Sequence, residues 1–208
     1  MEVNGKHMYS ADFMKAVGKA DDNRVHITIP EARQCLEGYL RREIGNSFKW
    51  LPPYDEIVDW LTDNHGLGLL CLGNNGLGKT LICSNAIPAM LSYFMNKVVY
   101  SVDACRMASY RKELLYCHIL SIDDVGAEPL AVDYGNKAYV FPEVVDAAEK
   151  RSKLLLITSN LSSEEIVAKY GIRTFDRLRG ICKVVLFKGK SLRNGGGTAN
   201  PGVSPRTT

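Results

Sequence analysis

Short apolar runs alternate with longer amphipathic stretches from residue 66 onward. The runs have the length of strands buried on both faces, and they cover residues 69–72, 98–102, 119–123, 154–158 and 182–187. Helical patterns separate the first four runs. Strands that alternate with helices usually pair in parallel through right-handed crossovers. The pattern therefore predicts an α/β fold, with a five-stranded parallel sheet between two helical layers and no separate lid domain.

The chain ahead of this alternation has a helical pattern. Residues 30–45 place apolar side chains at helical spacing, with Pro30 near the start, and residues 52–64 form a second such stretch. A weaker amphipathic stretch follows Ser10, a residue that favours helix starts. The apolar faces of these helices either pack onto the rest of the protein or form an arm that binds a partner.

The composition fits one globular domain with a small appendage. Hydrophobic residues make up 46% and charged residues 24% of the 208 positions, which are ordinary values for a globular protein. We expect a helical N-terminal region over residues 1–53, an α/β domain over residues 54–193, and a disordered tail rich in Gly, Pro, Ser and Thr over residues 194–208. No apolar run approaches the length of a membrane span, and the first residues lack a signal-peptide core. The protein is therefore expected to be cytoplasmic, without a membrane partner.

Six cysteines and an uneven charge distribution add to this picture. The cysteines occur singly, without the spacing of a metal site, and we expect reduced thiols in the core. Residues 1–66 carry 8 Lys/Arg against 11 Asp/Glu, whereas residues 150–194 carry 11 against 3. The basic part is either a solvated face or a surface for phosphate-rich partners, nucleotides or nucleic acid.

The first apolar run leads into the stretch GNNGLGKTL, residues 73–81. It matches the phosphate-loop pattern G-x-x-x-x-G-K-[ST] at every fixed position. A helical pattern follows it, and we expect Pro88 to kink or shorten that helix. Glycines let backbone N–H groups turn inward around a phosphate chain, and the helix start adds its positive dipole end. Lys79 would reach the β and γ phosphates, and the Thr80 hydroxyl would bind Mg²⁺. The expected nucleotide-binding residues are Gly73, Asn74, Asn75, Gly76, Leu77, Gly78, Lys79, Thr80 and Leu81.

Polar groups follow two further apolar runs. Asp123 and Asp124 end the third run, where their carboxylates would face the phosphates of an open α/β sheet. Asp123 suits Mg²⁺ and Asp124 suits the attacking water, with Glu128 as a weaker candidate for the water. Asn160 follows the fourth run and either holds the water or the γ-phosphate, or is a turn asparagine.

An ordered set of segments carries a family resemblance. The segments GLLCLGNNGLGKT, ILSIDDVGAE, LLLITSNLS, YGIRTFDRLRG and FKGKSLR together resemble the AAA+ ATPases of the DnaC/DnaI helicase-loader and IstB transposition-helper group. The resemblance covers about residues 54–193 and implies an ATPase that uses ATP and Mg²⁺.

The resemblance also implies roles for single residues. Lys79 and Thr80 would be the Walker A pair, Asp123 and Asp124 the Walker B pair, and Asn160 the sensor 1 residue. Arg177 takes the place of an arginine finger that acts in a neighbouring subunit, with Arg173 as an accessory, and Arg193 resembles a sensor 2 arginine that touches the nucleotide. The family then implies self-association into a ring or spiral. Arg173, Arg177 and Arg179 crowd one helix, where Asp176 is the only acid expected to pair with them.

Two features depart from the family pattern. Asp124 stands where many AAA+ proteins have the longer Glu, which predicts slow hydrolysis. The segment between the second and third apolar runs is shorter than the family's usual insertion, which contributes to contacts with single-stranded DNA. Its charged and aromatic residues suit either such a contact or an amphipathic surface helix; they are Arg106, Tyr110, Arg111 and Lys112.

Three functions are compatible with these residues. The first is an ATP-dependent replication protein that binds single-stranded DNA and loads or remodels a replicative helicase, gripped by the N-terminal helices. The second is an IstB-like ATPase that assembles on duplex DNA and recruits a transposase. The third is an ATP-gated adaptor that binds nucleotide and partner with little turnover, which Asp124 in place of Glu would allow.

Overall fold

A computed structural model describes residues 24–133 and 136–189 of the chain. The five predicted strands are all present, at β1 (Gly68–Gly73), β2 (Tyr100–Asp103), β3 (Ile119–Val125), β6 (Leu154–Ser159) and β7 (Cys182–Phe187). They form one sheet in the order β2-β3-β6-β1-β7, and every pairing is parallel. The predicted α/β fold with a five-stranded parallel sheet is confirmed.

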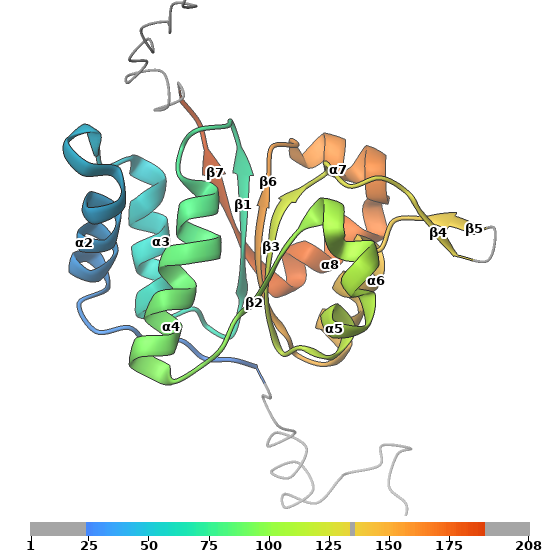
Figure 1. Cartoon of the computed structure of the whole chain (residues 1–208), viewed down its shortest axis with the longest axis horizontal. Coiled ribbons are helices and arrows are strands. Elements are labelled where there is room, and N and C mark those ends of the chain that lie inside the picture. Colours follow the sequence, from blue (N-terminus) through green and yellow to red (C-terminus); the bar gives the residue numbers. More distant parts are fainter. Residues whose placement is uncertain (1–23, 134–135, 190–208) are drawn as a thin grey trace, which may run out of the picture.

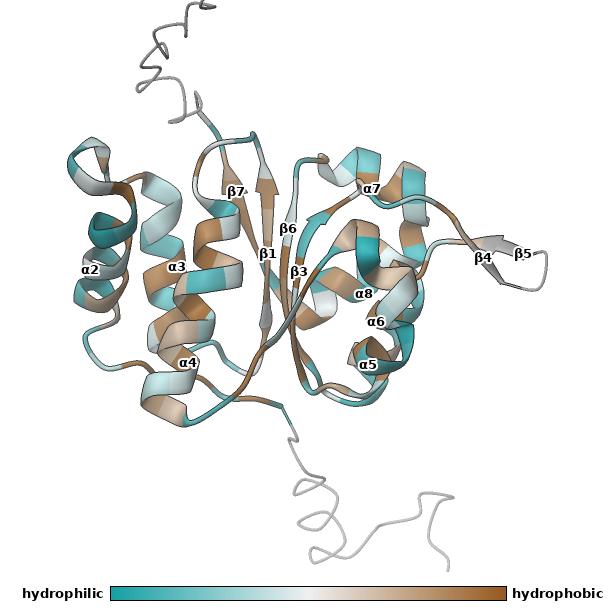
Figure 2. Ribbon diagram, viewed as in Figure 1, coloured by the Kyte–Doolittle hydropathy of each residue, from teal (hydrophilic) through white to brown (hydrophobic). Residues whose placement is uncertain are grey.

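Helices cover both faces of this sheet (Figure 1). One layer contains α2 (Ala32–Ile44), α3 (Pro52–Thr62) and α4 (Ile87–Met95), and the other contains α5 (Arg111–Tyr116), α6 (Phe141–Lys150), α7 (Ser163–Tyr170) and α8 (Ile172–Ile181). Shorter helical segments lie at Gly45–Ser47, Leu81–Ala86 and Ala104–Tyr110. Figure 2 shows the apolar positions concentrated on the strands and on the helix sides that face them.

The core lies in two parts, one on each face of the sheet. Because successive strand residues point to opposite faces, Leu69 and Cys71 of β1 join one buried cluster and Leu70 and Leu72 join the other. The first cluster also contains Leu36 of α2, which is completely buried. Residues 24–53 thus pack into the same core as the sheet.

Two features differ from the sequence expectations, and other expectations fall on residues that the structure does not describe. A hairpin of β4 (Ala131–Asp133) and β5 (Asn136–Ala138) lies between β3 and α6 and projects from the body (Figure 1). The weak amphipathic stretch after Ser10, the tail and Arg193 lie outside the described residues. The described cysteines are all free thiols, and Cys105 is exposed, so the core expectation is wrong for that residue.

The helix after the phosphate-loop sequence does not end at Pro88. It runs to Met95, and its hydrogen bonding widens to a π-helix at Leu81–Ala86, where the Ile87 N–H bonds to the Ile82 carbonyl five residues back. Proline has no N–H for the carbonyl four residues earlier and its ring crowds that carbonyl, so the wider turn accommodates Pro88 without an early end. Within the described residues, no helix combines the length and apolar character that crossing a membrane requires.

Candidate nucleotide site

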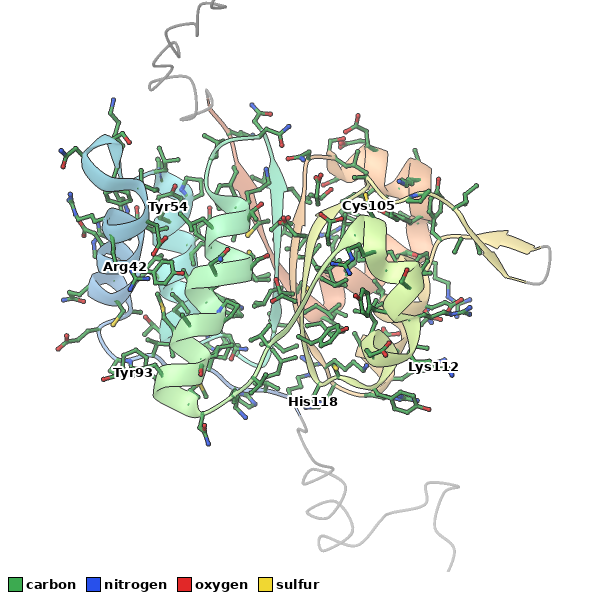
Figure 3. All side chains as sticks on the ribbon, in the orientation of Figure 1. Arg42, Tyr54, Tyr93, Cys105, Lys112 and His118 are labelled. Atoms are coloured by element: carbon green, nitrogen blue, oxygen red, sulfur yellow. The ribbon has the colours of Figure 1, made fainter. Side chains whose placement is uncertain are left out.

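A cavity of about 450 Å³ opens at the carboxyl ends of the strands. Tyr54 and Cys105 are labelled near this end of the molecule in Figure 3, whereas His118 lies at the opposite end. Carboxyl ends of parallel strands are the usual ligand position in an open α/β sheet, because the loops there diverge around a crevice. The cavity is lined by Ile44, Tyr54, Asn75, Gly76, Gly78, Lys79, Thr80, Leu81, Asp103, Asp123, Asp124, Thr158 and Asn160.

Glycines give the loop after β1 its path. Gly73 has φ +123°, and a Cβ there would lie 2.1 Å from the Phe187 carbonyl oxygen, so only glycine fits. Gly78 has φ +85°, and its Cβ would come within 2.9 Å of the Tyr54 hydroxyl. The Asn74 N–H donates to the same Phe187 carbonyl at 3.1 Å, which fixes the start of the loop to the end of β7. The loop is thus enclosed by the end of β7 on one side and by Tyr54 of α3 on the other.

Lys79 lies at the centre of this loop. Its ammonium group donates to the carbonyl oxygens of Gly73 at 2.7 Å and Asn74 at 2.8 Å, and to Oδ1 of Asn160 at 2.9 Å. The residue is 6% exposed, and burial lowers the pKa of its ammonium group, while the nearby Asp124 and Asp123 carboxylates act in the opposite direction. A cation is therefore fixed at the position where the sequence predicts contact with phosphates.

The two carboxylates occupy different hydrogen-bonding environments. The Thr158 hydroxyl donates to Asp123 Oδ1 at 2.6 Å and accepts the Asp124 N–H at 2.9 Å. The amide nitrogen of Asn160 donates to Asp124 Oδ1 at 2.5 Å. Lys79, Asn160 and Asp124, which come from three separate elements, are therefore linked in one chain of hydrogen bonds.

Oxygen ligands suitable for Mg²⁺ line the same cavity. Mg²⁺ prefers one or two protein oxygens together with water and phosphate, and the Thr80 hydroxyl and the Asp123 carboxylate both line the cavity. Within the described ranges, no group of three His, Cys, Asp or Glu side chains could hold a metal ion. The residues therefore fit a magnesium ion shared with a phosphate ligand, and not an all-protein metal centre.

Four cavity residues were not predicted as part of the site. Asp103 ends β2 directly beside Asp123 in the sheet register, and the end of the second apolar run could have indicated it. Thr158 is the last residue of the fourth apolar run, so its position at that strand end could have indicated it. Ile44 and Tyr54 come from the N-terminal helices, and the Tyr54 hydroxyl donates to the Leu77 carbonyl at 3.1 Å. No sequence signal links them to the phosphate loop.

Glu128 lies outside the residues that line the cavity. Its side chain is buried, it accepts the Gly126 N–H at 2.8 Å, and it accepts a hydrogen bond from the Tyr170 hydroxyl. The geometry therefore favours Asp124 over Glu128 as the group that could contact a water molecule in the cavity.

Arg177 also lies outside the cavity lining, and its pairing differs from the expectation. It forms ion pairs with Asp146 and, at 2.8 Å, with Glu149, both on α6. The expectation that Asp176 would be the only intrachain acid was wrong, because packing of α8 on α6 brings these carboxylates together across about thirty residues of sequence. Arg173 and Arg179 are exposed.

The predicted DNA-contact residues are partly paired within the chain. Arg111 binds both carboxylate oxygens of Glu143, at 2.9 and 2.8 Å. The Arg106 guanidinium lies 5.0 Å from the centre of the Tyr110 ring and donates to its hydroxyl. Lys112 is exposed, so Arg106, Tyr110 and Lys112 are the candidates that remain accessible on this segment.

Comparisons with known proteins identify the fold. Neither a protein-family model nor a curated protein matches the sequence. The crystal structure of the DnaC helicase loader matches with a TM-score of 0.55 at 17% identity, covering 69% of this chain and 95% of that chain. This chain shares its fold with that helicase loader. The DnaI crystal structure matches with a TM-score of 0.50 at 18% identity, over 61% of this chain and 73% of that one.

A replication initiator shares the fold as well. AMPPCP-bound DnaA from Aquifex aeolicus matches with a TM-score of 0.51 at 14% identity, covering 68% of this chain and 48% of that chain. At these identities the matches show the shared fold alone.

Proposed function

We propose that this chain is a slow ATPase of the helicase-loader type, which binds ATP with Mg²⁺ in the phosphate-loop cavity. The observation that carries the proposal is the chain of hydrogen bonds from Lys79 through Asn160 to Asp124. These bonds support the proposal because they bring the Lys79 ammonium group, the Asn160 amide and the Asp124 carboxylate together beside the cavity. The fold shared with a helicase loader and with AMPPCP-bound DnaA supports this proposal.

Each part of the nucleotide has a candidate binding group. The loop from Gly73 to Leu81 would surround the phosphates with N–H groups, and Lys79 would exchange one of its present acceptors for phosphate oxygen. Thr80 and Asp123 would hold the magnesium ion, which neutralises phosphate charge when bound. The apolar side chains of Ile44 and Leu81 offer a wall for the base.

Asp124 and Asn160 would act on the attacking water. Asn160 donates a hydrogen bond to Oδ1 of Asp124. The other carboxylate oxygen, Oδ2, would accept a proton from the water molecule while the water oxygen attacks the γ-phosphorus. The aspartate side chain is one methylene shorter than glutamate and has to reach further for the same contact. Hydrolysis is therefore proposed to be slow.

The proposal extends to partners. The protein would act in the cytoplasm. A replicative helicase would bind the N-terminal region, residues 1–53. Single-stranded DNA would bind near Arg106, Tyr110 and Lys112. Subunits would associate into a ring or spiral in which Arg177 and Arg173 reach a neighbour's nucleotide, and Arg193 would contact the nucleotide of its own chain. The exposed positions of Arg173 and Lys112 support these contacts.

The test is ATP hydrolysis measured alone, with single-stranded DNA and with duplex DNA. We expect slow basal turnover that single-stranded DNA stimulates. Lys79→Ala should weaken ATP affinity by about a hundredfold, because it removes the cation from the phosphates, while the melting temperature changes little. Lys150→Ala, which removes an exposed lysine at the end of α6, is the matched control.

Three outcomes would contradict the proposal. Equal ATP affinity of Lys79→Ala and wild type would remove the phosphate-loop assignment. Stimulation by duplex DNA alone would favour the IstB-like function. Tight ATP binding without turnover under all three conditions would identify an ATP-gated adaptor.

A further inference from the structure

Residues 124–128, the Asp124 loop, comprise the end of β3 and the turn after it, and they contact the last turn of α7. Glu128, which is 5% exposed, accepts the Gly126 N–H at 2.8 Å through Oε2 and the Tyr170 hydroxyl through Oε1. The Lys169 ammonium group donates to the carbonyl oxygens of Gly126 at 2.5 Å and Glu128 at 3.2 Å. Residues 126–128 therefore receive bonds from two consecutive side chains of α7.

The backbone of this loop requires such support. Asp124 has φ +57°, a left-handed conformation that is unfavourable for a residue with a Cβ, and Gly126 has φ +112°. A Cβ at Gly126 would lie 2.6 Å from a methyl carbon of Leu161, so the loop also packs tightly against the segment after β6. The pairing of β3 with β6 is irregular between Ile122 and Val125, so a regular strand ladder does not fix Asp124. The Asp124 backbone is held by the Thr158 hydroxyl, which accepts its N–H at 2.9 Å, and by the Ala127 N–H, which donates to its carbonyl at 3.1 Å. The contacts with α7 hold the residues that follow it.

The same helix begins beside the second polar group of the site. Asn160, which donates to Asp124, lies three residues before the first residue of α7. The start of α7 is fixed by a capping box between Ser162 and Glu165. Helix α7, with eight residues, therefore begins just after Asn160. Its last turn holds the Asp124 loop through Glu128.

We propose that Glu128 and Tyr170 are positioning residues that hold Asp124 in line with Asn160 and the attacking water. This inference rests on the proposed ATPase function. Glu128 acts through the Gly126 amide and the loop backbone, and it does not contact the cavity. Tyr170 fixes the Glu128 carboxylate from the side of α7. A displacement of α7 would move Asp124 and Asn160 together, which makes α7 the element through which a bound partner could change the hydrolysis rate.

The test compares four variants in steady-state ATP hydrolysis. Tyr170→Phe and Glu128→Ala should each lower kcat by about tenfold or more, with KM and the affinity for ATP unchanged, because misplacement of a reacting group slows chemistry without removing binding groups. Glu128→Gln should keep most of the activity. Its amide oxygen can accept the Gly126 N–H, and its NH₂ group can donate to the Tyr170 oxygen.

The matched control is Tyr139→Phe. The Tyr139 ring packs against Tyr170 with 5.3 Å between ring centres, and its hydroxyl makes no hydrogen bond seen within the described part of the chain. This variant removes a hydroxyl from the same aromatic cluster without touching Glu128, so its kcat should equal that of wild type. If Tyr139→Phe loses as much kcat as Tyr170→Phe, the loss comes from packing of the aromatic cluster and not from the hydrogen bond to Glu128, and the inference is overturned.

Two further outcomes would overturn it. Unchanged kcat in Tyr170→Phe would show that the contact does not position Asp124. Glu128→Gln as inactive as Glu128→Ala would identify Glu128 as the group that takes the proton from water.

Hydrogen exchange of the Gly126 amide separates this inference from the proposed function. If the wild-type protein hydrolyses no ATP, the ATPase proposal fails and the exchange rate still decides whether the loop is held by α7. We expect faster exchange of this amide in Tyr170→Phe and an unchanged rate in Tyr139→Phe. Equal rates in all three proteins would overturn the inference.

Discussion

At the scale of single residues, the candidate site depends on side chains that share hydrogen bonds. Lys79 and Asp124 are connected through the Asn160 amide. Its oxygen accepts a hydrogen bond from Lys79, and its nitrogen donates one to Asp124. An amide is suited to this position because it has a donor and an acceptor on one planar group. A leucine of similar size would leave the buried Lys79 ammonium with one acceptor fewer.

Asp124→Asn tests the carboxylate separately from binding. The change keeps the shape of the side chain and its Oδ1 contact with Asn160, but it removes the charge and the basic oxygen that would accept a proton from water. We expect single-turnover hydrolysis to fall by about a hundredfold, with the affinity for ATP unchanged. Asp176→Asn, an exposed acid on α8, serves as the control. Normal turnover in Asp124→Asn would exclude Asp124 as the proton acceptor.

Tyr54 leads to a prediction about alkaline stability. Burial raises the pKa of Tyr54 to about 12, so the folded protein favours the neutral phenol. This contribution to stability is complete below the pKa of the unfolded chain, about 10, and is lost as pH rises from there toward 12. Thermal unfolding between pH 8 and 11 should show a falling melting temperature above about pH 10.

Tyr54→Phe provides the comparison for this slope. At pH 8 the variant should lose about 1 kcal/mol of stability, because the Leu77 carbonyl loses its hydrogen bond. Above pH 10 its melting temperature should fall less steeply than that of wild type. Parallel pH curves for the two proteins would show that Tyr54 does not cause the alkaline loss.

At the scale of secondary-structure elements, the N-terminal helices contribute to the core and to the site. Helix α2 buries Leu36 and Leu40 completely, and α3 buries Tyr54, which contacts the phosphate loop. The sequence left open whether these apolar faces pack on the domain or bind a partner. The described part, residues 24–53, packs on the domain, and its role in partner binding stays a prediction.

Leu36→Ala tests whether α2 and the sheet unfold as one unit. Truncation of a fully buried leucine should lower the free energy of unfolding by about 2–5 kcal/mol, and one cooperative transition should remain. Leu130→Ala is the control, because Leu130 is 45% exposed. Two separate transitions, or an unchanged melting temperature, would show that residues 24–53 form an independent region.

At the scale of the whole molecule, Arg177 is the residue whose proposed role in a neighbour's site would depend on assembly. Its ion pairs with Asp146 and Glu149 join α8 to α6, and its side chain is 17% exposed. A role in a neighbour's site would require Arg177 to leave these carboxylates when subunits associate. The two roles, a structural ion pair and a residue acting in trans, make different predictions.

A mixing experiment distinguishes them. Arg177→Ala, which retains Lys79, is combined with Lys79→Ala, which retains Arg177, and we expect the mixture to recover about a quarter or more of the activity if sites are shared between subunits. The double variant Asp146→Asn with Glu149→Gln frees Arg177 without removing it, so it should stay active in the trans role. If the double variant loses as much ATPase activity as Arg177→Ala, activity requires the ion pairs of Arg177 with α6. No recovery in the mixture, under conditions where oligomers form, would exclude the trans role.

The sequence alone determined the strands and the phosphate loop, because both depend on local physics. A run of four to six largely apolar residues favours a strand through local preference, and all five predicted strands are found in the sheet. The second run is the exception to full burial, since it leads into the edge strand β2 and its Val98 is 86% exposed. Glycine spacing sets the loop path directly, as the positive φ values of Gly73, Gly76 and Gly78 show. The short hairpin at Ala131–Asp133 and Asn136–Ala138 was missed, because three-residue strands carry too few positions for a pattern.

Only the tertiary structure decided which polar groups meet. Glu128 and Asp124 are four residues apart, and the sequence favoured Asp124 without excluding Glu128. In the structure, Tyr170, more than forty residues later, binds Glu128 away from the cavity, whereas Asp124 lines it. Arg177 likewise pairs with acids on α6, not with the adjacent Asp176. Such pairings depend on how helices pack across the sheet, and that packing is set by the sum of many apolar contacts. The apolar pattern of a stretch therefore predicts whether it forms a strand or a helix. It does not predict which distant polar side chains will become hydrogen-bond or ion-pair partners.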